Sequence, residues 1–393
     1  MGMDPGFHRG DDMAWIPAFA GKTDGAVDFR STLSKSFGLE PRGVKSIMNL
    51  EEFNYELAES LIAAFPSRER EGSRLLVIRR STGEIVHSVF AELGNFLDAG
   101  DLLVLNETKV FPARLIGSKD SGGKIEVLLL ERFPDDGRSF WLALVDAAKK
   151  PRVGSVLHFG GSLTAEVIGD MGHGRFGLEF HHDGEFGVQL EILGQPPLPP
   201  YVRRRREAEA LDRERYQTVY AAHPGAIAAP TAGFHFTEEL FAKLAAKGIE
   251  RATLTLHVGP GTFQPVRVHE IENHRMEGER YALDAATAAK INSTKATGHR
   301  IVAVGSTSTR TLEWIVRQKG QVEADEGIAR LYLRPGDPFR VLDALITNFH
   351  LPGSTPLILV AAFAGLDLIR RAYQEAIERQ YRFYSYGDAM LIL

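Results

Sequence analysis

The amino-acid sequence predicts an α/β protein with a mixed, largely parallel sheet, helices on both faces, and a small antiparallel β-barrel inserted into the chain. Two observations support this prediction. After about residue 195, strand-like runs alternate with helix-like runs, which is typical of parallel strands joined by crossover helices. Between residues 111 and 194, short alternating strands are separated by glycine-rich turns without a convincing helix before the end, which favours a barrel.

The elements before the barrel follow from the hydrophobic pattern. An amphipathic helix is expected around residues 55–64, ending at Pro66, and residues 73–80 have the pattern of a strand. Residues 101–106 are mostly Leu and Val between a glycine and a polar loop, so we expect a strand buried on both faces. Residues 1–47 show no sustained period, and we expect a disordered or non-native N-terminal extension there.

The barrel and the second half of the chain have equally regular patterns. A proline-rich linker, GQPPLPPY at residues 194–201, is a semi-rigid return path from the barrel. The expected barrel strands are 124–130, 140–145 and 163–168; later strands are 251–258, 300–304 and 342–349, and helices are 238–247, 285–294, 311–318 and 366–380. We therefore expect an α/β catalytic domain at 48–110 and 195–393, interrupted by a barrel domain at 111–194.

Composition excludes several classes of function. The chain has 393 residues and a formal net charge of −5, so any contact with RNA needs a local basic patch. It has no cysteine, which excludes disulfides, thiolate zinc sites and iron–sulfur clusters, and with them radical S-adenosylmethionine chemistry. The longest apolar run, residues 356–365, is about half of the roughly 20 residues that a membrane-spanning helix needs. We expect a cytoplasmic protein without a membrane segment.

Four polar loops carry the candidate chemistry. In sheets of this kind, ligands bind beyond the carboxyl ends of the strands. There the loop at 259–263 (GPGTF) offers two glycines, and the run at 306–310 (STSTR) opens a helix with hydroxyls and an arginine, which suits an anion. The remaining loops are 350–355 (HLPGST) and 228–237, of which the second ends in a helix N-cap.

Each of these features also has a structural explanation. A hydroxyl-rich turn often only caps a helix, and a histidine at a strand end is often only hydrogen-bonded. The sequence contains no G-x-G-x-x-G after a strand, no G-x-x-x-x-G-K-[ST] and no H-E-x-x-H, so we predict no dinucleotide or nucleoside-triphosphate site and no metal. The basic cluster Arg203, Arg204, Arg205 and Arg206 either contacts phosphate or forms a solvated helix face.

Several strings across residues 48–393 resemble the S-adenosylmethionine:tRNA ribosyltransferase-isomerase family of queuosine biosynthesis. They are 106–117 (NETKVFPARLIG), 122–130 (GGKIEVLLL), 194–201, 214–221 (ERYQTVYA), 225–237 (GAIAAPTAGFHFT), 254–266 (LTLHVGPGTFQPV), 304–313, 343–355 (DALITNFHLPGST) and 381–392 (YRFYSYGDAMLI). One departure is Glu277, which stands where the family has a second histidine. The extension before Met48 has no counterpart in the family.

The resemblance implies a reaction. The aminomethyl nitrogen of a 7-aminomethyl-7-deazaguanine in tRNA attacks the ribosyl part of S-adenosylmethionine, adenine and methionine leave, and epoxyqueuosine-tRNA forms. S-adenosylmethionine is then a cosubstrate and no cofactor stays bound. The implied partner is tRNA with a GUN anticodon, and the expected state is a monomer. Two rivals are an RNA-binding module without chemistry and an RNA methyltransferase, which would release S-adenosylhomocysteine.

The reaction needs a general base, because a proton leaves the ribose carbon beside sulfur and the attacking amine is neutral. The candidates, in no fixed order, are His257, His350, Asp388 and Glu277. Expected contacts of the cosubstrate are Gly259, Gly261, Thr262, Ser306, Thr307, Arg310, Asn348 and Ser354, with Arg310 on the methionine carboxylate unless it pairs with Glu313 or another acidic neighbour on its own helix. Expected contacts of the tRNA are Asn106, Arg114, Glu126, Thr231, His235, Arg203, Arg204, Arg205 and Tyr216.

Overall fold

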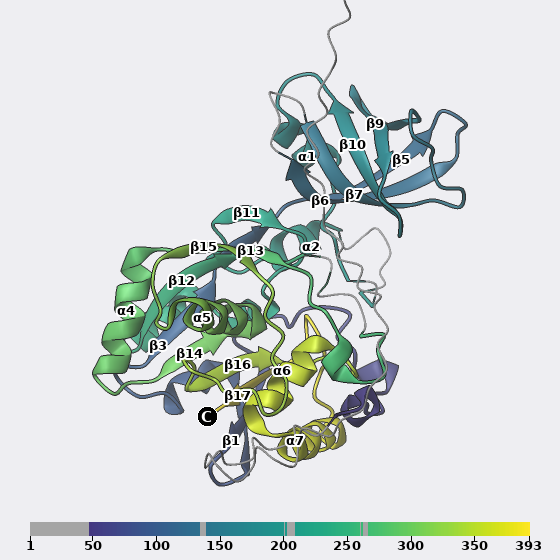
Figure 1. Ribbon diagram of the computed structural model, residues 1–393. Coiled ribbons are helices and arrows are strands. Elements are labelled where there is room, and N and C mark those ends of the chain that lie inside the picture. The colour runs from purple at the N-terminus through teal and green to yellow at the C-terminus, as the bar shows by residue number, and fades with distance from the viewer. Residues whose placement is uncertain (1–46, 134–138, 200, 203–208, 260, 262–265) are drawn as a thin grey trace, which may run out of the picture. The chain divides into compact units, whose positions relative to one another are not determined.

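The computed structural model describes residues 47–133, 139–199, 201–202, 209–259, 261 and 266–393. Within these ranges the chain forms a nine-stranded sheet with its helices and a separate six-stranded closed barrel (Figure 1). The predicted fold class, mixed α/β with an inserted antiparallel barrel, is confirmed. Of the expected N-terminal extension, residues 1–47, all but Ile47 lie outside the described residues, and the expected domain boundaries stay predictions.

The large sheet has a parallel centre and antiparallel edges. Its order is β15 (Asp325–Ala329), β13 (Glu279–Leu283), β12 (Glu250–Leu256), β3 (Leu102–Asn106), β14 (Ile301–Val304), β16 (Ala344–Asn348), β17 (Ala389–Ile392), β1 (Arg74–Arg79) and β2 (Glu84–Val89). The neighbours β12, β3, β14 and β16 are parallel, as are β17 and β1. The other four neighbouring pairs are antiparallel, so the sheet is more evenly mixed than the sequence predicts.

Both faces of the sheet are buried. In strand β1, Leu76 and Ile78 belong to one apolar core, whereas Leu75 and Val77 belong to the other. This alternation explains why the central strands are continuous apolar runs. The first core also contains residues of α4 (Ala285–Ala296), α5 (Gly305–Lys319), α6 (Thr355–Ala364) and α7 (Leu366–Glu378), and the second contains residues of η3 (Phe90–Asn95) and α3 (Glu238–Ala246).

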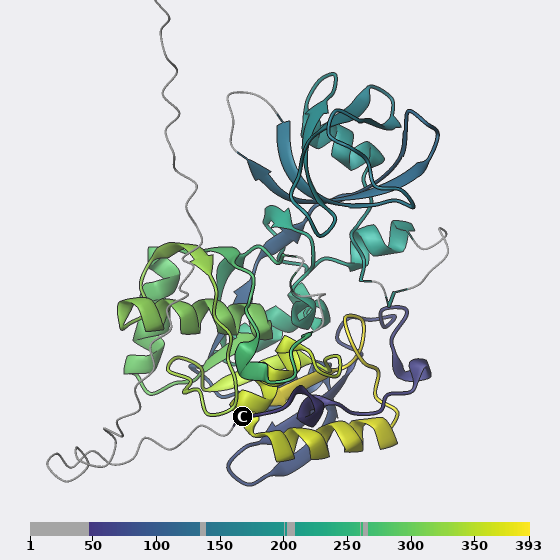
Figure 2. The same ribbon diagram turned by 45° about the vertical axis from the view of Figure 1, so that its right-hand side comes forward.

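The barrel has its own core. Its six antiparallel strands, in the order in which they pair, are β10 (Arg175–His181), β7 (Ser139–Asp146), β6 (Lys124–Phe133), β5 (Arg114–Lys119), β8 (Val156–Gly160) and β9 (Leu163–Asp170). Helix α1 (Phe186–Leu193) follows β10 and buries Leu190 in the barrel core (Figure 2). Shorter elements are a parallel pair, β4 (Thr108–Val110) with β11 (His223–Ala226), helix α2 (Glu209–Arg215), and the 3₁₀ turns η1 (Leu50–Phe53), η2 (Glu59–Leu61), η5 (Thr231–His235) and η7 (Ile271–Asn273).

One predicted element is wrong. Residues 55–64 contain only the short turn η2 and no α-helix. The segment pairs with a distant part of the chain instead, because the amide of Phe383 donates to the carbonyl of Leu61 at 2.8 Å and that of Ala63 to the carbonyl of Phe383 at 3.2 Å. Backbone hydrogen bonds to a distant segment therefore override the local amphipathic pattern.

Candidate active site

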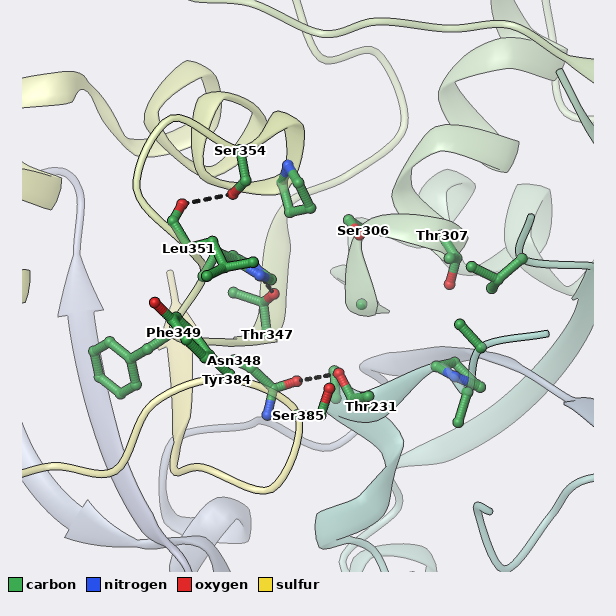
Figure 3. Close-up of a pocket in the computed structure, with 18 of the residues that line it drawn as sticks. Thr231, Ser306, Thr307, Thr347, Asn348, Phe349, Leu351, Ser354, Tyr384 and Ser385 are labelled. Carbon is green, nitrogen blue, oxygen red and sulfur yellow. Dashed lines mark hydrogen bonds between the residues drawn. The ribbon is translucent and has the colours of Figure 1, made fainter. Parts of the chain in front are cut away.

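A pocket of about 750 Å³ lies beyond the carboxyl ends of β14 and β16, where the sequence predicts the ligand-binding loops (Figure 3). We refer to it as the main pocket. Figure 3 shows Ser354 and Leu351 on one side, Ser306 and Thr307 across from them, and Asn348 facing Thr231. Three of the four predicted loops, at 228–237, 306–310 and 350–355, therefore meet in one pocket.

Helix α5 begins five residues earlier than Arg310, at Gly305. Gly305 has φ +88°, a conformation that other residues rarely adopt, and it allows the sharp change from strand to helix. The hydroxyls of Ser308 and Thr309 each donate to the carbonyl four residues earlier at 3.0 Å, so they do not face a ligand. Ser306 and Thr307 are the members of the predicted hydroxyl run that line the main pocket.

Arg310 is buried in an ion pair with Glu279 of β13, with 2.5 Å between Nη1 and Oε2. Its Nε donates to the carbonyl of Leu331 at 3.2 Å. The acidic residue of its own helix, Glu313, accepts hydrogen bonds from the amides of residues 340–342 and from Arg317. The alternative that Arg310 pairs within its own helix is therefore wrong, although it does have an acidic partner.

A second hollow of about 350 Å³ lies beside the main pocket, and Ser306, Thr307 and Pro356 line both. Three buried polar atoms on residues that line this hollow have no hydrogen-bond partner among the described residues: Thr307 Oγ1, Arg310 Nη2 and Tyr332 Oη. Buried polar atoms are rarely unpaired in proteins. All three can donate a hydrogen bond, which suits an anionic group such as a carboxylate.

Asn348 connects two predicted tRNA contacts. Its Oδ1 accepts from the hydroxyl of Thr231 at 2.9 Å, and its Nδ2 donates to Nε2 of His235 at 3.2 Å. Because an amide nitrogen only donates, Nε2 of His235 is unprotonated. Burial lowers the pKa of His235 to about 4, which keeps this ring neutral at physiological pH.

His350 lines the main pocket and is held from several sides. Its Nε2 hydrogen-bonds with the hydroxyl of Thr347 at 2.8 Å, and its amide donates to the hydroxyl of Tyr373 at 2.9 Å. The hydroxyl of Tyr55 donates to its carbonyl. Burial lowers the pKa of His350 to about 3, so the side chain is neutral near pH 7 and can accept a proton, although as a weak base.

His257 lies in a different place from His350. It lines a larger hollow together with Gly259 and Glu277, and its Nδ1 hydrogen-bonds with the hydroxyl of Thr108 at 2.8 Å. Burial lowers the pKa of His257. Gly225 lies against the ring so closely that an added Cβ would be 2.6 Å from it. The two histidines thus face two separate hollows.

The two carboxylate candidates are already paired. Asp388 is buried and accepts from the amides of Arg74 and Arg382 at 3.1 and 2.8 Å and from Nε of Arg74 at 3.1 Å. Glu277 forms an ion pair with Arg175 of the barrel. Asp388 is not among the residues that line the main pocket, and neither is Glu277.

Three predicted tRNA contacts make strong internal hydrogen bonds. Asn106 is fully buried and joins β3 to β12, because its side chain both donates to and accepts from the backbone of Leu256 at 2.9 Å. In the barrel, Arg114 and Glu126 form a two-pronged pair with both distances 2.7 Å. Tyr216 is also buried, but it lines the main pocket.

Some of the remaining predicted residues lie within the ranges that the structure describes, and others do not. Ser354 lines the main pocket and caps α6, since its hydroxyl accepts from the amide of Leu357 at 3.4 Å. The amide of Gly259 donates to Glu279 at 3.1 Å, and Gly261 lies against Glu277. Thr262, Arg203, Arg204 and Arg205 lie outside the described residues.

Sequence reasoning missed several pocket residues. Tyr201 and Tyr384 line the main pocket with ring centroids 4.8 Å apart, and Tyr201 shares a hydrogen bond of 2.5 Å with Ser385. Tyr384 has φ +72°, which is uncommon for a residue with a side chain and often marks a functional position. The linker ending in Tyr201 and the string at 381–392, which contains Tyr384 and Ser385, carried a signal in the sequence; nothing local distinguishes Tyr332 or Glu279.

Two features are absent from the described part of the chain. No three His, Asp or Glu side chains in these ranges are grouped so that they could hold a metal ion. No helix in the same ranges is long and apolar enough to cross a membrane. What ligands the main pocket takes has to be argued from its donors and from related proteins.

Comparison with known proteins gives such relatives. Residues 50–392 match the family model described as queuosine biosynthesis protein. The S-adenosylmethionine:tRNA ribosyltransferase-isomerases of Trichlorobacter lovleyi and Symbiobacterium thermophilum are 47% and 49% identical over 346 and 348 residues, covering 88% of this chain and 100% of each relative. The protein of the same name from Anaeromyxobacter sp. (strain K) is 50% identical over 347 residues, covering 88% of this chain and 99% of its own.

A solved structure is also similar. The crystal structure of S-adenosylmethionine tRNA ribosyltransferase from Thermotoga maritima is 38% identical, with 87% of this chain and 100% of that chain covered and a TM-score of 0.49. The resemblance seen in the sequence strings is confirmed by the family match and by relatives that align over their whole length. The chain belongs to the S-adenosylmethionine:tRNA ribosyltransferase-isomerase family of queuosine biosynthesis.

Proposed function

We propose that this chain transfers and isomerises the ribosyl part of S-adenosylmethionine onto 7-aminomethyl-7-deazaguanine in a tRNA anticodon, giving epoxyqueuosine-tRNA, adenine and methionine. Membership in the family supports the reaction. The observation that carries it in the structure is the pair of adjacent hollows, the second of which is lined by Thr307, Arg310 and Tyr332, whose donors are unpaired within the described residues. A cosubstrate with a bulky nucleoside at one end and a carboxylate at the other fits such a site.

The amino-acid end of S-adenosylmethionine is placed in the second hollow. Its carboxylate would accept from Nη2 of Arg310 and from the hydroxyls of Thr307 and Tyr332, which lack partners in the described part of the chain. Nη1 of Arg310 stays with Glu279, which fixes the direction of the guanidinium. The nucleoside part then occupies the main pocket, where Tyr201 and Tyr384 offer aromatic faces near the positive sulfur.

His350 is proposed as the base that removes the proton from the ribose carbon beside sulfur. Of the four candidates it is the one that lines the main pocket, and its lowered pKa leaves it unprotonated near pH 7, although it also makes the ring a weak base. Thr347 holds the ring by a hydrogen bond to Nε2. His257, in the neighbouring hollow, is the alternative, and Glu277 and Asp388 are less suited because each already pairs with an arginine.

The tRNA substrate is proposed to carry a GUN anticodon, with the modified base reaching the main pocket beside Thr231 and Tyr216. His235 supports this side through Asn348, because its ring accepts a hydrogen bond from the side-chain amide of Asn348 and so orients it. Arg203, Arg204 and Arg205 remain proposed phosphate contacts by their charge alone.

The reaction is tested by mixing the protein with S-adenosylmethionine and tRNA that carries 7-aminomethyl-7-deazaguanine, and by measuring the products. Release of adenine and methionine with formation of epoxyqueuosine is expected. Release of S-adenosylhomocysteine would instead identify a methyltransferase, and tRNA binding without any product would identify a binding module.

The role of His350 is tested by His350→Gln, with His158→Gln as a matched control on the barrel surface, where His158 pairs with Asp120. Loss of a general base should lower the rate of adenine release by about 100-fold or more while S-adenosylmethionine still binds. A His350→Gln variant with normal turnover, together with an inactive His257→Gln, would transfer the role to His257.

A further inference from the structure

A small hollow of about 230 Å³ lies next to the main pocket and is lined by two arginines, Arg70 and Arg215. Three serine residues, Ser67, Ser73 and Ser385, also line it. Arg70 comes from the segment before β1, and Arg215 is the last residue of α2. Two segments that are far apart in the sequence thus bring two guanidinium groups and several hydroxyls to one place.

Among the described residues, both arginines donate to backbone carbonyls. Nη1 of Arg70 donates to the carbonyl of Phe234 at 3.1 Å, and Nη2 of Arg215 donates to that of Ser67 at 2.8 Å. Nε of Arg215 is buried and has no hydrogen-bond partner in the ranges that the structure describes. Within the described ranges, neither arginine has a carboxylate within ion-pair distance, whereas nearby Arg74 pairs with Asp388.

The charges in this hollow are therefore poorly compensated. Burial and the positive charge of Arg215 both lower the pKa of Arg70, and Glu214 only partly opposes them. Holding two like charges together in a partly buried hollow is unfavourable unless an anion joins them. An oxyanion with several acceptor oxygens would engage both guanidinium groups and the unpaired Nε of Arg215.

The position of the hollow indicates which kind of anion would bind there. Ser385 lines both the hollow and the main pocket. Phe234 and His235 line the hollow, and they belong to the same short turn, η5, whose first residue Thr231 lines the main pocket. An anion bound here would thus lie beside whatever occupies the main pocket. In tRNA every nucleotide is flanked by phosphates, which such a position would meet.

We propose that Arg70 and Arg215 bind a backbone phosphate of the tRNA next to the nucleotide that is modified. This assignment rests on the proposed function, since it requires tRNA to be the substrate. A carboxylate of the cosubstrate is the other anion at hand, but unpaired donors for it lie in the separate hollow of Arg310. Phosphate contacts of this kind position the nucleic acid without reading its sequence.

The test uses the full-length protein with Arg70→Gln and with Arg215→Gln. Arg79→Gln is the matched control, because Arg79 lies at the opposite end of β1 and forms an exposed ion pair with Glu84. Each hollow variant should weaken tRNA binding about 10-fold. The slope of the logarithm of affinity against the logarithm of salt concentration should become shallower by about one. Binding of S-adenosylmethionine should be unchanged, and the control should match wild type in all three measurements.

Thermal melting of each variant shows whether it is folded. Arg215→Lys provides a second variant, which keeps the charge and should recover part of the tRNA affinity. Normal tRNA affinity and salt slope in folded Arg70→Gln and Arg215→Gln would overturn the proposal. So would a loss of S-adenosylmethionine binding with tRNA binding intact, which would assign the hollow to the cosubstrate. Failure of the proposed function looks different, because the wild-type protein itself would then release no adenine.

Discussion

Arg310 of α5 and Glu279 of β13 form a buried ion pair at the end of the second hollow, with 6% and 5% of their surfaces exposed. Removing two charges from water costs free energy, which their attraction offsets only in good geometry. The pair leaves Nη2 of Arg310 without a protein partner. Glu279 therefore orients the arginine toward the hollow.

Arg310→Lys should weaken binding of S-adenosylmethionine while tRNA binding stays nearly unchanged. Lysine keeps the charge next to Glu279, but it cannot present a second nitrogen in a fixed direction. Loss of one charge-assisted hydrogen bond costs about 1.5 to 3 kcal/mol, or on the order of 10-fold to 100-fold in the cosubstrate dissociation constant. Calorimetry of both ligands measures this, and a collapse of tRNA affinity with normal cosubstrate binding would place Arg310 on the RNA.

Glu279→Gln should destabilise the protein, because it leaves Arg310 charged and unpaired in a buried position. The expected loss in the free energy of unfolding is about 3 to 5 kcal/mol. Glu84→Gln is the control, since Glu84 and Arg79 form an exposed pair at 3.3 Å that should contribute less than about 1 kcal/mol. Urea unfolding of both variants measures the difference, and equal losses would contradict the prediction.

Two buried histidines should make stability depend on pH. Burial lowers the pKa of His235 to about 4 and that of His350 to about 3, whereas an unfolded histidine has a pKa of about 6.5. Below about pH 6.5 the unfolded chain therefore takes up protons that the folded chain does not. The free energy of unfolding should be largest above that pH and fall by about 1.4 kcal/mol per pH unit for each histidine as the pH drops toward 4.

Urea unfolding at about pH 7, 6 and 5 of the wild type and of His235→Gln gives this slope. The variant should lose about half of the decrease that the two histidines cause. An unchanged slope in His235→Gln would show that its proton uptake does not drive acid destabilisation.

Turnover should persist in EDTA without added reductant. The chain has no cysteine, and the described ranges contain no grouping of three metal-binding side chains. A pre-folded anticodon stem-loop serves as substrate, so that chelation does not act through the folding of the tRNA. Loss of activity that a divalent ion restores on this substrate would indicate a metal site after all.

A protein that starts at Met48 should melt within a few degrees of the full chain and keep its activity. From this point on the chain is attached to the folded body, since Leu50 donates its amide to the carbonyl of His269 at 2.8 Å and Asn49 bridges to Glu270. Differential scanning calorimetry and the adenine assay compare the two forms, and a shortened protein that fails to fold would show that residues 1–47 are needed.

The sequence predicted elements whose signal is local. The central strands appear in it as short apolar runs and α3 as an N-cap, Thr237, whose hydroxyl does accept from the amide of Leu240 at 3.0 Å. The error at residues 55–64 has the opposite cause, because the pairing of Leu61 with Phe383 joins segments that no local pattern connects. Likewise nothing in the strand-like run at 279–283 indicates that Glu279 reaches Arg310.

The sequence predicted which loops form the site, but it did not predict which side chains contact one another there. Polar loops that follow parallel strands must meet at one edge of a sheet, and Ser306, Asn348 and Ser354 do line one pocket. Which side chains point into it depends on where the helix starts, and an onset at Gly305 directs the hydroxyls of Ser308 and Thr309 back to the backbone. The proposed roles of these residues await the measurements above.

The place of β17 has a consequence for synthesis on the ribosome. This strand, Ala389–Ile392, is inserted between β16 and β1, so the sheet is complete only after β17 itself has been made. Strand β1 ends at Arg79, and at about 5 to 20 residues per second its neighbour appears roughly 15 to 60 s later. During translation an apolar strand edge thus stays open, which makes the nascent chain prone to misassociation and a natural client for chaperones at the tunnel exit.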